Sequence, residues 1–245
     1  MMTDGGAMQK NSTAIILKRI PYGDSDLIVT FFSREFGKMS GLAKSARASR
    51  KRFAGSLEPG MFVDVQFVER PSSELVRIDR ADPLRPIDGM LRSIERINAM
   101  GRAVELASAF LQPHQVSESK FKLLDRYLLW LGENDPTPGT SLIFEFKWLM
   151  RCGFTPELSK CLMCDEGFAS NRGWSFDLDH GGFVCSSCSS SVGARLPLTG
   201  VAADALRITA LGEHRIERCA AEAAFAVLSR YSDHILGRPL KYRAL

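Results

Sequence analysis

The chain has 245 residues, of which 45% are hydrophobic and 24% are charged, and its formal net charge is +4. This composition is typical of a soluble globular protein of one or two domains. No apolar run approaches the length of a membrane span, and the start lacks the basic and apolar regions of a secretory signal. We therefore expect a cytoplasmic protein whose six cysteines are reduced thiols or metal ligands.

The positive charge is concentrated near the start of the chain. Residues 10–82 hold 13 Lys and Arg against 9 Asp and Glu, whereas the remainder holds 19 of each kind. Between Glu35 and Glu58 there are six basic residues and no acidic one, namely Lys38, Lys44, Arg47, Arg50, Lys51 and Arg52. Such a local field attracts a polyanion, so we predict that these six bind nucleic acid; the alternative is a solvated basic loop.

Short strands are predicted over the first 82 residues. Apolar or alternating runs separated by turn residues occupy positions 12–20, 26–33, 37–43, 60–68 and 73–82. Five strands in so short a segment predict a small closed barrel, preceded by a polar, mobile tail at 1–11. The basic segment lies in the connection between the third and fourth strands. Phe53 is the nearest aromatic residue, and it could stack on a base or lie in the barrel core.

The pattern changes to a helical period after Pro83 and Pro86. Apolar residues recur every three or four positions over 91–104 and over 121–131, the second stretch after a possible cap at Ser117. Thr140 is a candidate cap for a helix over 141–152 that Gly153 would end, and two more helices are expected over 199–211 and 213–236. These apolar stripes indicate core packing. The predicted boundaries are therefore a barrel at 12–82 and a helical domain at 83–245.

Four cysteines form a pair of matched motifs inside the helical domain. Cys161-x-x-Cys164 is followed by 20 residues and then by Cys185-x-x-Cys188. Two such turns converge on one ion, so the spacing predicts a tetrahedral structural zinc site in a module at 158–192. Between them, "WSFDL", "DHGG" and "FVC" predict a hairpin of the zinc-ribbon kind. An iron–sulfur cluster, or His180 in place of one cysteine, are the less favoured alternatives.

Catalytic motifs are not found. The chain has no phosphate-binding loop, no H-E-x-x-H and no G-x-S-x-G, so we predict no catalytic residues and no enzyme activity. The carboxylate pairs Asp24/Asp26 and Asp177/Asp179 are interpreted as turn residues rather than metal ligands. Cys152 and Cys219 are predicted to be buried structural thiols. His114, His214 and His234 are interpreted as ordinary.

Three stretches resemble the RecO family of DNA repair proteins. Residues 14–60, "AIILKRIPYGDSDLIVTFFSREFGKMSGLAKSARASRKRFAGSLEPG", are similar to its amino-terminal signature. "GFTPELSKCLMC" (153–164) and "FVCSSC" (183–188) are similar to its two cysteine turns. One departure is Asp24-Ser25-Asp26, where the family often has glutamate. The order of domains matches over about residues 12–243.

The resemblance implies an α+β architecture, with an OB-fold barrel followed by an all-α domain that carries the inserted four-cysteine module. It also implies binding of single- and double-stranded DNA at the bacterial nucleoid, and annealing of complementary strands without ATP. The implied partners are RecR and the acidic C-terminal tail of single-stranded DNA-binding protein, and RecA indirectly, with no membrane. Because some members of the family lack the cysteines, the implied role of zinc is structural.

Two other functions compete with that expectation. A zinc-ribbon transcription or RNA-processing factor would use the barrel for RNA, and a metal-dependent nuclease would use Asp24 and Asp26.

The acidic tail of single-stranded DNA-binding protein would need an apolar cleft beside a basic side chain on the helical domain. Candidates for that side chain are Arg102, Lys122 and Arg126.

Overall fold

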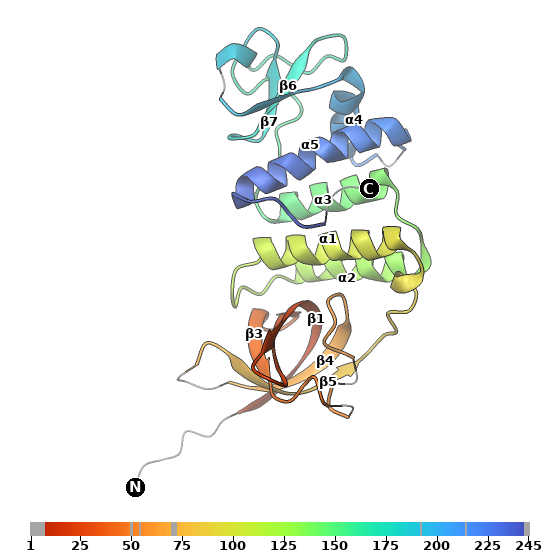
Figure 1. The fold of residues 1–245 in the computed structure, drawn as a ribbon. Coiled ribbons are helices and arrows are strands. Elements are labelled where there is room, and N and C mark those ends of the chain that lie inside the picture. Colours follow the sequence, from red (N-terminus) through yellow and green to blue (C-terminus); the bar gives the residue numbers. More distant parts are fainter. Residues whose placement is uncertain are drawn as a thin grey trace. The chain divides into compact units, whose positions relative to one another are not determined.

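The computed structural model describes residues 8–49, 51–53, 55–69, 73–191, 193–213 and 215–242 (Figure 1). It divides into two compact units, Met1–Glu133 and Asn134–Leu245. The first unit holds the predicted strands together with the first two helices. The boundary between the two units, after Glu133, therefore lies beyond Pro83, where strands give way to helices.

The first unit contains a closed barrel of the strands β1 to β5. Their bounds are Gln9–Tyr22 (β1), Asp26–Ser33 (β2), Gly37–Ala43 (β3), Phe62–Val68 (β4) and Val76–Pro83 (β5). The order around the barrel is β1-β2-β3-β5-β4, and β4 pairs back onto β1. All neighbours are antiparallel except β3 and β5, which are parallel. This small closed barrel has the Greek-key arrangement of the OB-fold, so the predicted barrel is confirmed.

Alternation along the strands fills the barrel interior. Val29, Phe31, Val65 and Phe67 are fully buried, and the rings of Phe31 and Phe67 lie 5.9 Å apart. Because successive side chains of a strand point to opposite faces, the intervening residues point outward. The predicted strands are therefore in the register that the hydrophobic pattern requires.

Strand β1 is longer than the sequence predicts. Its first half pairs with β4 from Gln9 to Ile15, and its second half pairs with β2 up to Tyr22. A bulge between Ile16 and Lys18 bends the strand between the two partners. Gln9 and the two residues after it thus belong to a strand although they lie within the expected tail, because β4 offers them a pairing edge. Residues 1–7 lie outside the described residues.

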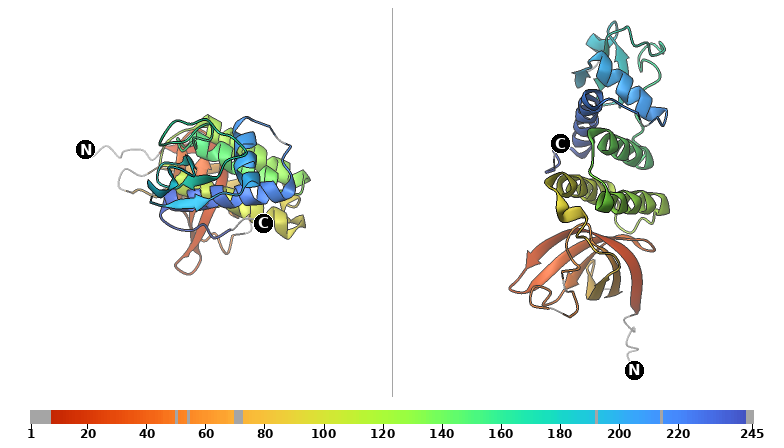
Figure 2. Two further views of the ribbon diagram at one scale, coloured as in Figure 1. Left: turned by 90° about the horizontal axis from the view of Figure 1, so that it is seen from above. Right: turned by 90° about the vertical axis from the view of Figure 1, so that its right-hand side faces the viewer.

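Two helices accompany the barrel in this unit. After η1 (Met90–Arg92) come α1 (Ile94–Phe110) and α2 (Glu118–Glu133), which run antiparallel and cover one end of the barrel (Figures 1 and 2). Phe121 of α2 packs against Phe32 and Phe62, with ring centroids 5.3 and 6.3 Å away. α2 begins directly after Ser117, the position where a cap is predicted.

A buried arginine joins the start of α1 to the end of α2. The guanidinium of Arg96 donates to the carbonyl oxygens of Gly89 and Gly132, at 2.9 and 3.1 Å. Gly89 lies so close to α2 that a Cβ built on it would be 2.1 Å from the Gly132 oxygen. Arg96 thereby occupies C-terminal carbonyls of α2 that have no partner within the helix.

The second unit contains the helices α3, α4 and α5 and a small sheet. Their bounds are Pro138–Arg151 (α3), Gly200–Ala210 (α4) and Arg218–Leu236 (α5), and α5 packs against both other helices. The predicted cap of α3 at Thr140 is wrong by three residues. Thr137 is the N-cap, and Thr140 is its partner at the third helical residue in a capping box. Pro138 occupies the first helical position, where its missing N–H costs nothing.

The small sheet has the order β7-β6-β8. β6 (Trp174–Asp177) and β7 (Gly182–Cys185) form the predicted antiparallel hairpin, and η2 (Ser189–Ser191) follows them. β8 (Arg195–Pro197) adds a third strand on the other side of β6 that the sequence does not predict. Among the described helices, none has the length and apolar character needed to cross a membrane.

Candidate nucleic-acid interface and metal centre

The loop between β3 and β4 carries the predicted basic residues and is anchored at both ends. Ala46 and Phe53 are buried in the barrel core, with 8% and 2% of their surface exposed. The N–H of Arg47 donates to the Ser25 carbonyl at 3.0 Å, and the N–H of Ser45 donates to the Asp26 carboxylate at 2.7 Å. These two hydrogen bonds attach the loop to the turn between β1 and β2.

Four basic side chains of this loop are exposed together: Lys44, Arg47, Lys51 and Arg52. Two of them also hold the backbone, because Arg47 donates to the Asp24 carbonyl at 3.1 Å and Arg52 donates to the Lys44 carbonyl at 2.7 Å. Within the part of the chain that the structure describes, none of the four forms an ion pair. We define these four as the basic loop. The fifth predicted residue there, Arg50, lies outside the described residues.

Lys38 lies apart from the basic loop. It is half-buried on β3, and its ammonium group donates to the carbonyl of Ser108 in α1 at 3.0 Å. Burial lowers the pKa of Lys38 from its usual value. Lys38 therefore connects the barrel to α1, and its charge is less available to a phosphate than those of the basic loop.

The two open interpretations of Phe53 are decided by its burial. Phe53 belongs to the barrel core, and the guanidinium of Arg52 lies over its ring, 5.1 Å from the centroid. The aromatic side chain that is exposed near the basic loop is Tyr22, with 56% of its surface accessible. Tyr22 is not among the predicted residues, although its place beside a turn could have suggested it.

The four cysteines come together in the second unit as the spacing predicts. Cys161 and Cys164 lie in a turn before β6, Cys185 ends β7, and Cys188 lies in the turn after it. The first turn is joined to β7 by the N–H of Leu162, which donates to the Phe183 carbonyl at 2.8 Å. All four sulfur atoms lie within 4.8 Å of one another, so they could hold a metal ion.

The sulfur geometry fits a single tetrahedral ion. The sulfurs of Cys164 and Cys185 are 3.8 Å apart, far beyond a disulfide bond. In a tetrahedral site with metal–sulfur bonds of about 2.3 Å, the sulfurs are about 3.8 Å apart. Backbone N–H groups of Met163 and Cys185 each point at the Cys161 sulfur at 3.4 Å, as expected for donors that stabilise a thiolate.

The thiols of the cluster differ in pKa because they lie next to one another. Burial raises the pKa of Cys161, but hydrogen bonds from the backbone of Cys185 and Met163 outweigh it and lower that pKa to about 6. Hydrogen bonds to the sulfurs of Cys185 and Cys164, together with their charge, raise the pKa of Cys188 to about 12. Four adjacent sulfurs thus cannot all become thiolates unless a positive ion offsets their repulsion.

Aromatic and polar contacts stabilise the module that carries the four cysteines. The rings of Phe168 and Phe183 lie 5.3 Å apart, and Trp174 is 5.3 Å from Phe168. The Nδ1–H of His180, the alternative ligand, donates to the Asp177 carboxylate at 2.9 Å, and His180 is not part of the sulfur cluster. Asp179 contacts His234 of α5 at 2.9 Å.

The other predicted residues have local roles. Cys152 is half-buried at the end of α3, but Cys219 is exposed, so the prediction that both are buried thiols is wrong for Cys219. Cys219 lies at the start of α5, where its helical position faces solvent rather than the core. Asp26 accepts the Ser45 N–H, consistent with a turn carboxylate. His214 lies outside the described residues.

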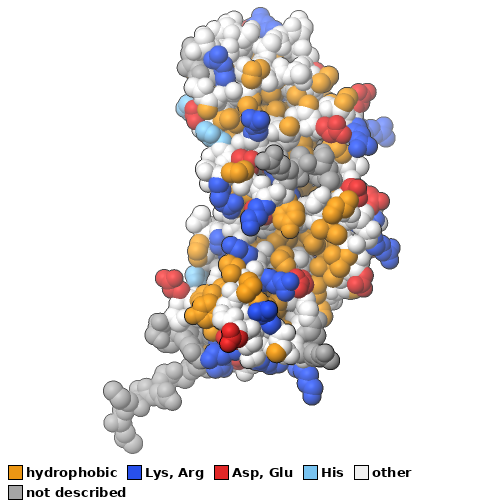
Figure 3. Space-filling view, viewed as in Figure 1, with side chains coloured by type: hydrophobic (Ala, Val, Ile, Leu, Met, Phe, Trp, Pro, Cys, Tyr) orange, Lys and Arg blue, Asp and Glu red, His pale blue; other side chains and the backbone are white. Residues whose placement is uncertain are grey.

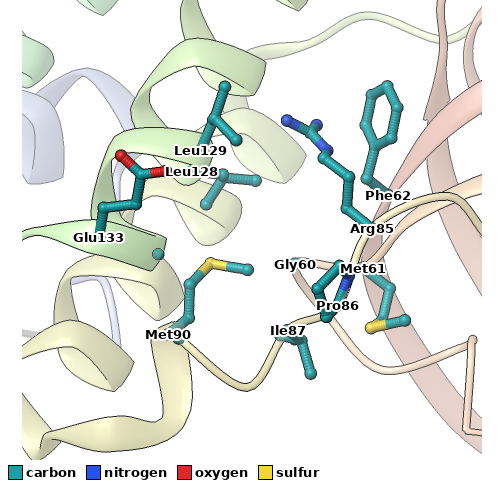
Figure 4. A pocket seen from close by; sticks show the side chains of 12 residues that line it. Gly60, Met61, Phe62, Arg85, Pro86, Ile87, Met90, Leu128, Leu129 and Glu133 are labelled. Atoms are coloured by element: carbon teal, nitrogen blue, oxygen red, sulfur yellow. The ribbon is translucent and has the colours of Figure 1, made fainter.

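An apolar pocket of about 260 Å³ lies in the first unit, between α2 and the residues that enter and leave the barrel (Figure 4). Leu128 and Leu129 face Arg85 and Phe62 across it, and the Arg85 guanidinium lies 3.8 Å from the Phe62 ring centroid. Figure 3 shows hydrophobic side chains gathered nearby, over η1 and the start of α1. This volume suits one apolar side chain rather than a cofactor.

The pocket's charges do not favour an acidic occupant. Arg85 is already paired with Asp125, and Glu133 lies on the rim. Of the basic residues predicted for an acidic tail, Arg102 is buried and Lys122 is paired with Glu118 at 2.8 Å. Arg126 is exposed on α2.

The chain thus combines an OB-fold barrel that has an exposed basic loop with helices and a four-cysteine module, and its sequence matches a known protein family over both parts. The family model described as "Recombination protein O N terminal" matches residues 8–87, and "Recombination protein O C terminal" matches residues 91–244. The chain belongs to the recombination protein O family. The junction of the two models lies close to the predicted boundary near Pro83.

Curated relatives carry the name DNA repair protein RecO. The one from Anaeromyxobacter sp. strain K is 34% identical over 237 residues, which cover 94% of this chain and 93% of the relative. The one from Syntrophus aciditrophicus is 29% identical over 92% of this chain and 90% of its own length. The one from Myxococcus xanthus is 36% identical over 71% of this chain and 70% of its own length.

Proposed function

We propose that this protein is a DNA repair mediator that binds single- and double-stranded DNA and anneals complementary strands without ATP. The observation that carries the proposal is the basic loop, whose four exposed charges have no acidic partner among the described residues. Membership of the recombination protein O family and the printed names of the relatives support it.

Annealing follows from the chemistry of such a loop. Two complementary strands repel each other through their phosphates, and bound Lys and Arg side chains reduce that repulsion. Because phosphate contacts carry no sequence information, the bases remain free to pair. The basic loop therefore lowers the barrier to duplex formation without choosing a sequence.

The partners in this proposal are RecR and the acidic tail of single-stranded DNA-binding protein, which together allow RecA to load on coated strands. The family resemblance supports these partners. On the helical part of the first unit, Arg126 is an exposed basic side chain available for an acidic tail.

The metal in this proposal is one structural zinc ion held by Cys161, Cys164, Cys185 and Cys188. The sulfur spacing favours a single ion over a larger iron–sulfur cluster. Four cysteine ligands leave no open coordination position for catalysis, so the ion would hold the module together. The resulting net negative charge makes this module a poor phosphate site.

Strand annealing tests the proposal. Two complementary oligonucleotides, one with a fluorophore and one with a quencher, are mixed with the protein in the absence of ATP. We expect faster annealing on bare strands and on strands coated with single-stranded DNA-binding protein. Equal rates with and without the protein on both substrates would refute the proposal, and acceleration only of RNA strands would favour the RNA-processing alternative.

A further inference from the structure

The outward face of β1, β2 and β3 is apolar beside the basic loop. In the register of the sheet, Ile20 lies opposite Ile28, and Ile28 lies opposite Leu42. One step further along, Tyr22 lies opposite Asp26. Opposed residues of neighbouring strands point to the same side, so these side chains share one face.

On β2 and β3 this face is the outer one, because the residues that alternate with it fill the barrel, whereas the end of β1 from Lys18 to Tyr22 is exposed on both faces. Leu27, Val29 and Ala43 are buried in the core. Ile20 and Tyr22, in contrast, expose 44% and 56% of their surface. Ile28 and Leu42 are half-buried.

An apolar outer face needs an explanation. In antiparallel sheets with one face on the core, the solvent face is normally polar. Single exposed hydrophobic residues are common, but four on adjacent strands form a continuous strip. We define the outer strip as Ile20, Tyr22, Ile28 and Leu42.

Polar and basic groups border the outer strip on both sides. On one side, Lys18 lies opposite Thr30, and Thr30 hydrogen bonds to Ser40 at 3.2 Å. On the other side, Lys44 follows β3 directly and begins the basic loop. A ligand on the strip would therefore meet apolar surface in the middle and positive charge at the edges. Opposite Tyr22 it would also meet the carboxylate of Asp26, which already accepts the Ser45 N–H at 2.7 Å.

Tyr22 lies where the strip and the basic loop meet. The turn that follows it accepts two hydrogen bonds from Arg47, one to the Asp24 carbonyl at 3.1 Å and one to the Ser25 carbonyl at 3.0 Å. These bonds hold the arginine beside the turn. A nucleotide whose phosphate meets the basic loop would thus place its base near the Tyr22 ring.

We propose that Tyr22 is a base-stacking platform and that the outer strip contacts the bases of single-stranded DNA whose phosphates meet the basic loop. This inference rests on the proposed function. It adds contacts to the bases to the phosphate contacts of the basic loop. Aromatic rings on OB barrels stack with unpaired bases irrespective of sequence. Because the bases of a duplex face each other, Tyr22 would favour single strands over duplexes and release the product of annealing.

The experiment compares Tyr22→Ala and Tyr22→Phe with the unaltered protein in fluorescence anisotropy. The probes are an oligo-dT strand, an abasic strand of equal length and charge, and a blunt duplex. Tyr22→Ala is expected to weaken dT binding about 5- to 150-fold, the range for one lost stacked base. Tyr22→Phe keeps the ring and should bind within about twofold of the unaltered protein.

Binding to the abasic strand and to the duplex should be the same for all three proteins, and the salt slope on dT should not change. Because Tyr22 is exposed, its replacement should leave the melting temperature unchanged. Tyr242→Ala, which removes another exposed tyrosine from the second unit, is the control and should bind like the unaltered protein.

Three results would overturn the inference. Tyr22→Ala could bind dT as well as the unaltered protein does, which would leave the strip to another partner. It could lose affinity for dT and the abasic strand equally, which would show a contact to the backbone alone. If the unaltered protein bound none of the probes, the proposed function would fail, and this inference with it.

Discussion

At the scale of the residue, Asp177 shows how one buried carboxylate organises a turn. Its side chain is fully buried and accepts the N–H groups of Asp179 and His180 at 2.9 and 3.3 Å. Its second oxygen lies 2.9 Å from the Nδ1 atom of His180. The hydrogen bond and charge of Asp177 raise the pKa of His180 above its usual value of 6.5.

A pH-dependent stability follows from this raised pKa. Protonated His180 is favoured in the folded protein, so its contribution is fully present below the unfolded pKa of about 6.5 and is lost as the pH rises through the folded pKa. We expect His180→Gln to lower the melting temperature slightly at pH 5.5 and not at pH 9. NMR titration of the ring, assigned with that variant, should give a pKa above 6.5; a value at or below 6.5 would contradict the contact.

Two aromatic residues show how position decides between core and surface. Phe53 and Tyr22 both lie near the basic loop, but 2% of the first and 56% of the second is exposed. Phe53 follows the exposed Arg52, so the local sequence does not distinguish a stacking ring from a buried one. Ala81 of β5 holds the segment around Phe53 against the barrel. Its N–H donates to the Arg52 carbonyl, and its carbonyl accepts from the Ser56 hydroxyl.

At the scale of the element, the proposed DNA binding by the basic loop predicts a salt dependence set by its number of phosphate contacts. Each phosphate neutralised on a single strand contributes about 0.7 to the slope of log K against log salt. We expect Lys44→Ala/Lys51→Ala to flatten that slope by about 1.4 and leave the melting temperature unchanged, because neither ammonium group makes a hydrogen bond to the described residues. Anisotropy titrations on dT at several salt concentrations measure it.

Arg80→Ala in β5 is the matched control for this loop. Its guanidinium is already paired with Asp82 at 2.6 Å, so its removal should leave the slope almost unchanged. If the control and the double variant changed the slope equally, the loop would have no special part in DNA binding.

The contact between η1 and α2 provides a second test at this scale. Gly89 has ordinary helical angles, φ −60° and ψ −36°, so only the nearby Gly132 carbonyl opposes a side chain there. Gly89→Ala should destabilise the first unit by about 1–3 kcal/mol, as expected for overpacking. Gly132→Ala, whose Cβ would meet nothing within 4 Å, should be neutral or slightly stabilising.

Urea unfolding followed by circular dichroism measures both glycine variants. Equal stability of Gly89→Ala and the unaltered protein would show that the two segments separate easily. The Arg96 hydrogen bonds to both carbonyls argue that they do not.

At the scale of the whole molecule, the four-cysteine cluster and the basic loop lie in different compact units. Each unit has its own core, so removal of the proposed zinc ion should unfold the module at 158–192 and leave the barrel folded. Hydrogen exchange after chelation should therefore increase around Trp174 and Phe183, whereas β2 and β3 stay protected. Protection lost throughout the chain would contradict this independence.

The proposed zinc site is tested separately by changing one of its cysteines. Purified protein should contain about one equivalent of zinc by elemental analysis, and Cys164→Ser should contain less than half. Cys219→Ser removes another exposed thiol and should keep the metal. Equal zinc in both variants would refute the four-cysteine site.

Much of this architecture follows from local pattern. Period-two alternation in β2 and β3 and the Cys-x-x-Cys turns are local features, so the sequence predicts both strands and the sulfur cluster. The third strand β8 is too short to show a pattern, and it forms because β6 has a free edge for it. Thr137 rather than Thr140 caps α3, because the helix already begins at Pro138. Local propensity does not fix the first residue of a helix.

By itself the sequence determined the barrel strands, the concentration of charge between Glu35 and Glu58, and the two Cys-x-x-Cys turns, since each depends on residues close together in the chain. Only the tertiary structure decided that Lys38 is tied to Ser108, that Phe53 is buried, and that Tyr22 is exposed next to a turn that Arg47 contacts. Those outcomes depend on barrel closure and strand register, which bring distant residues together and decide which side of each strand reaches solvent.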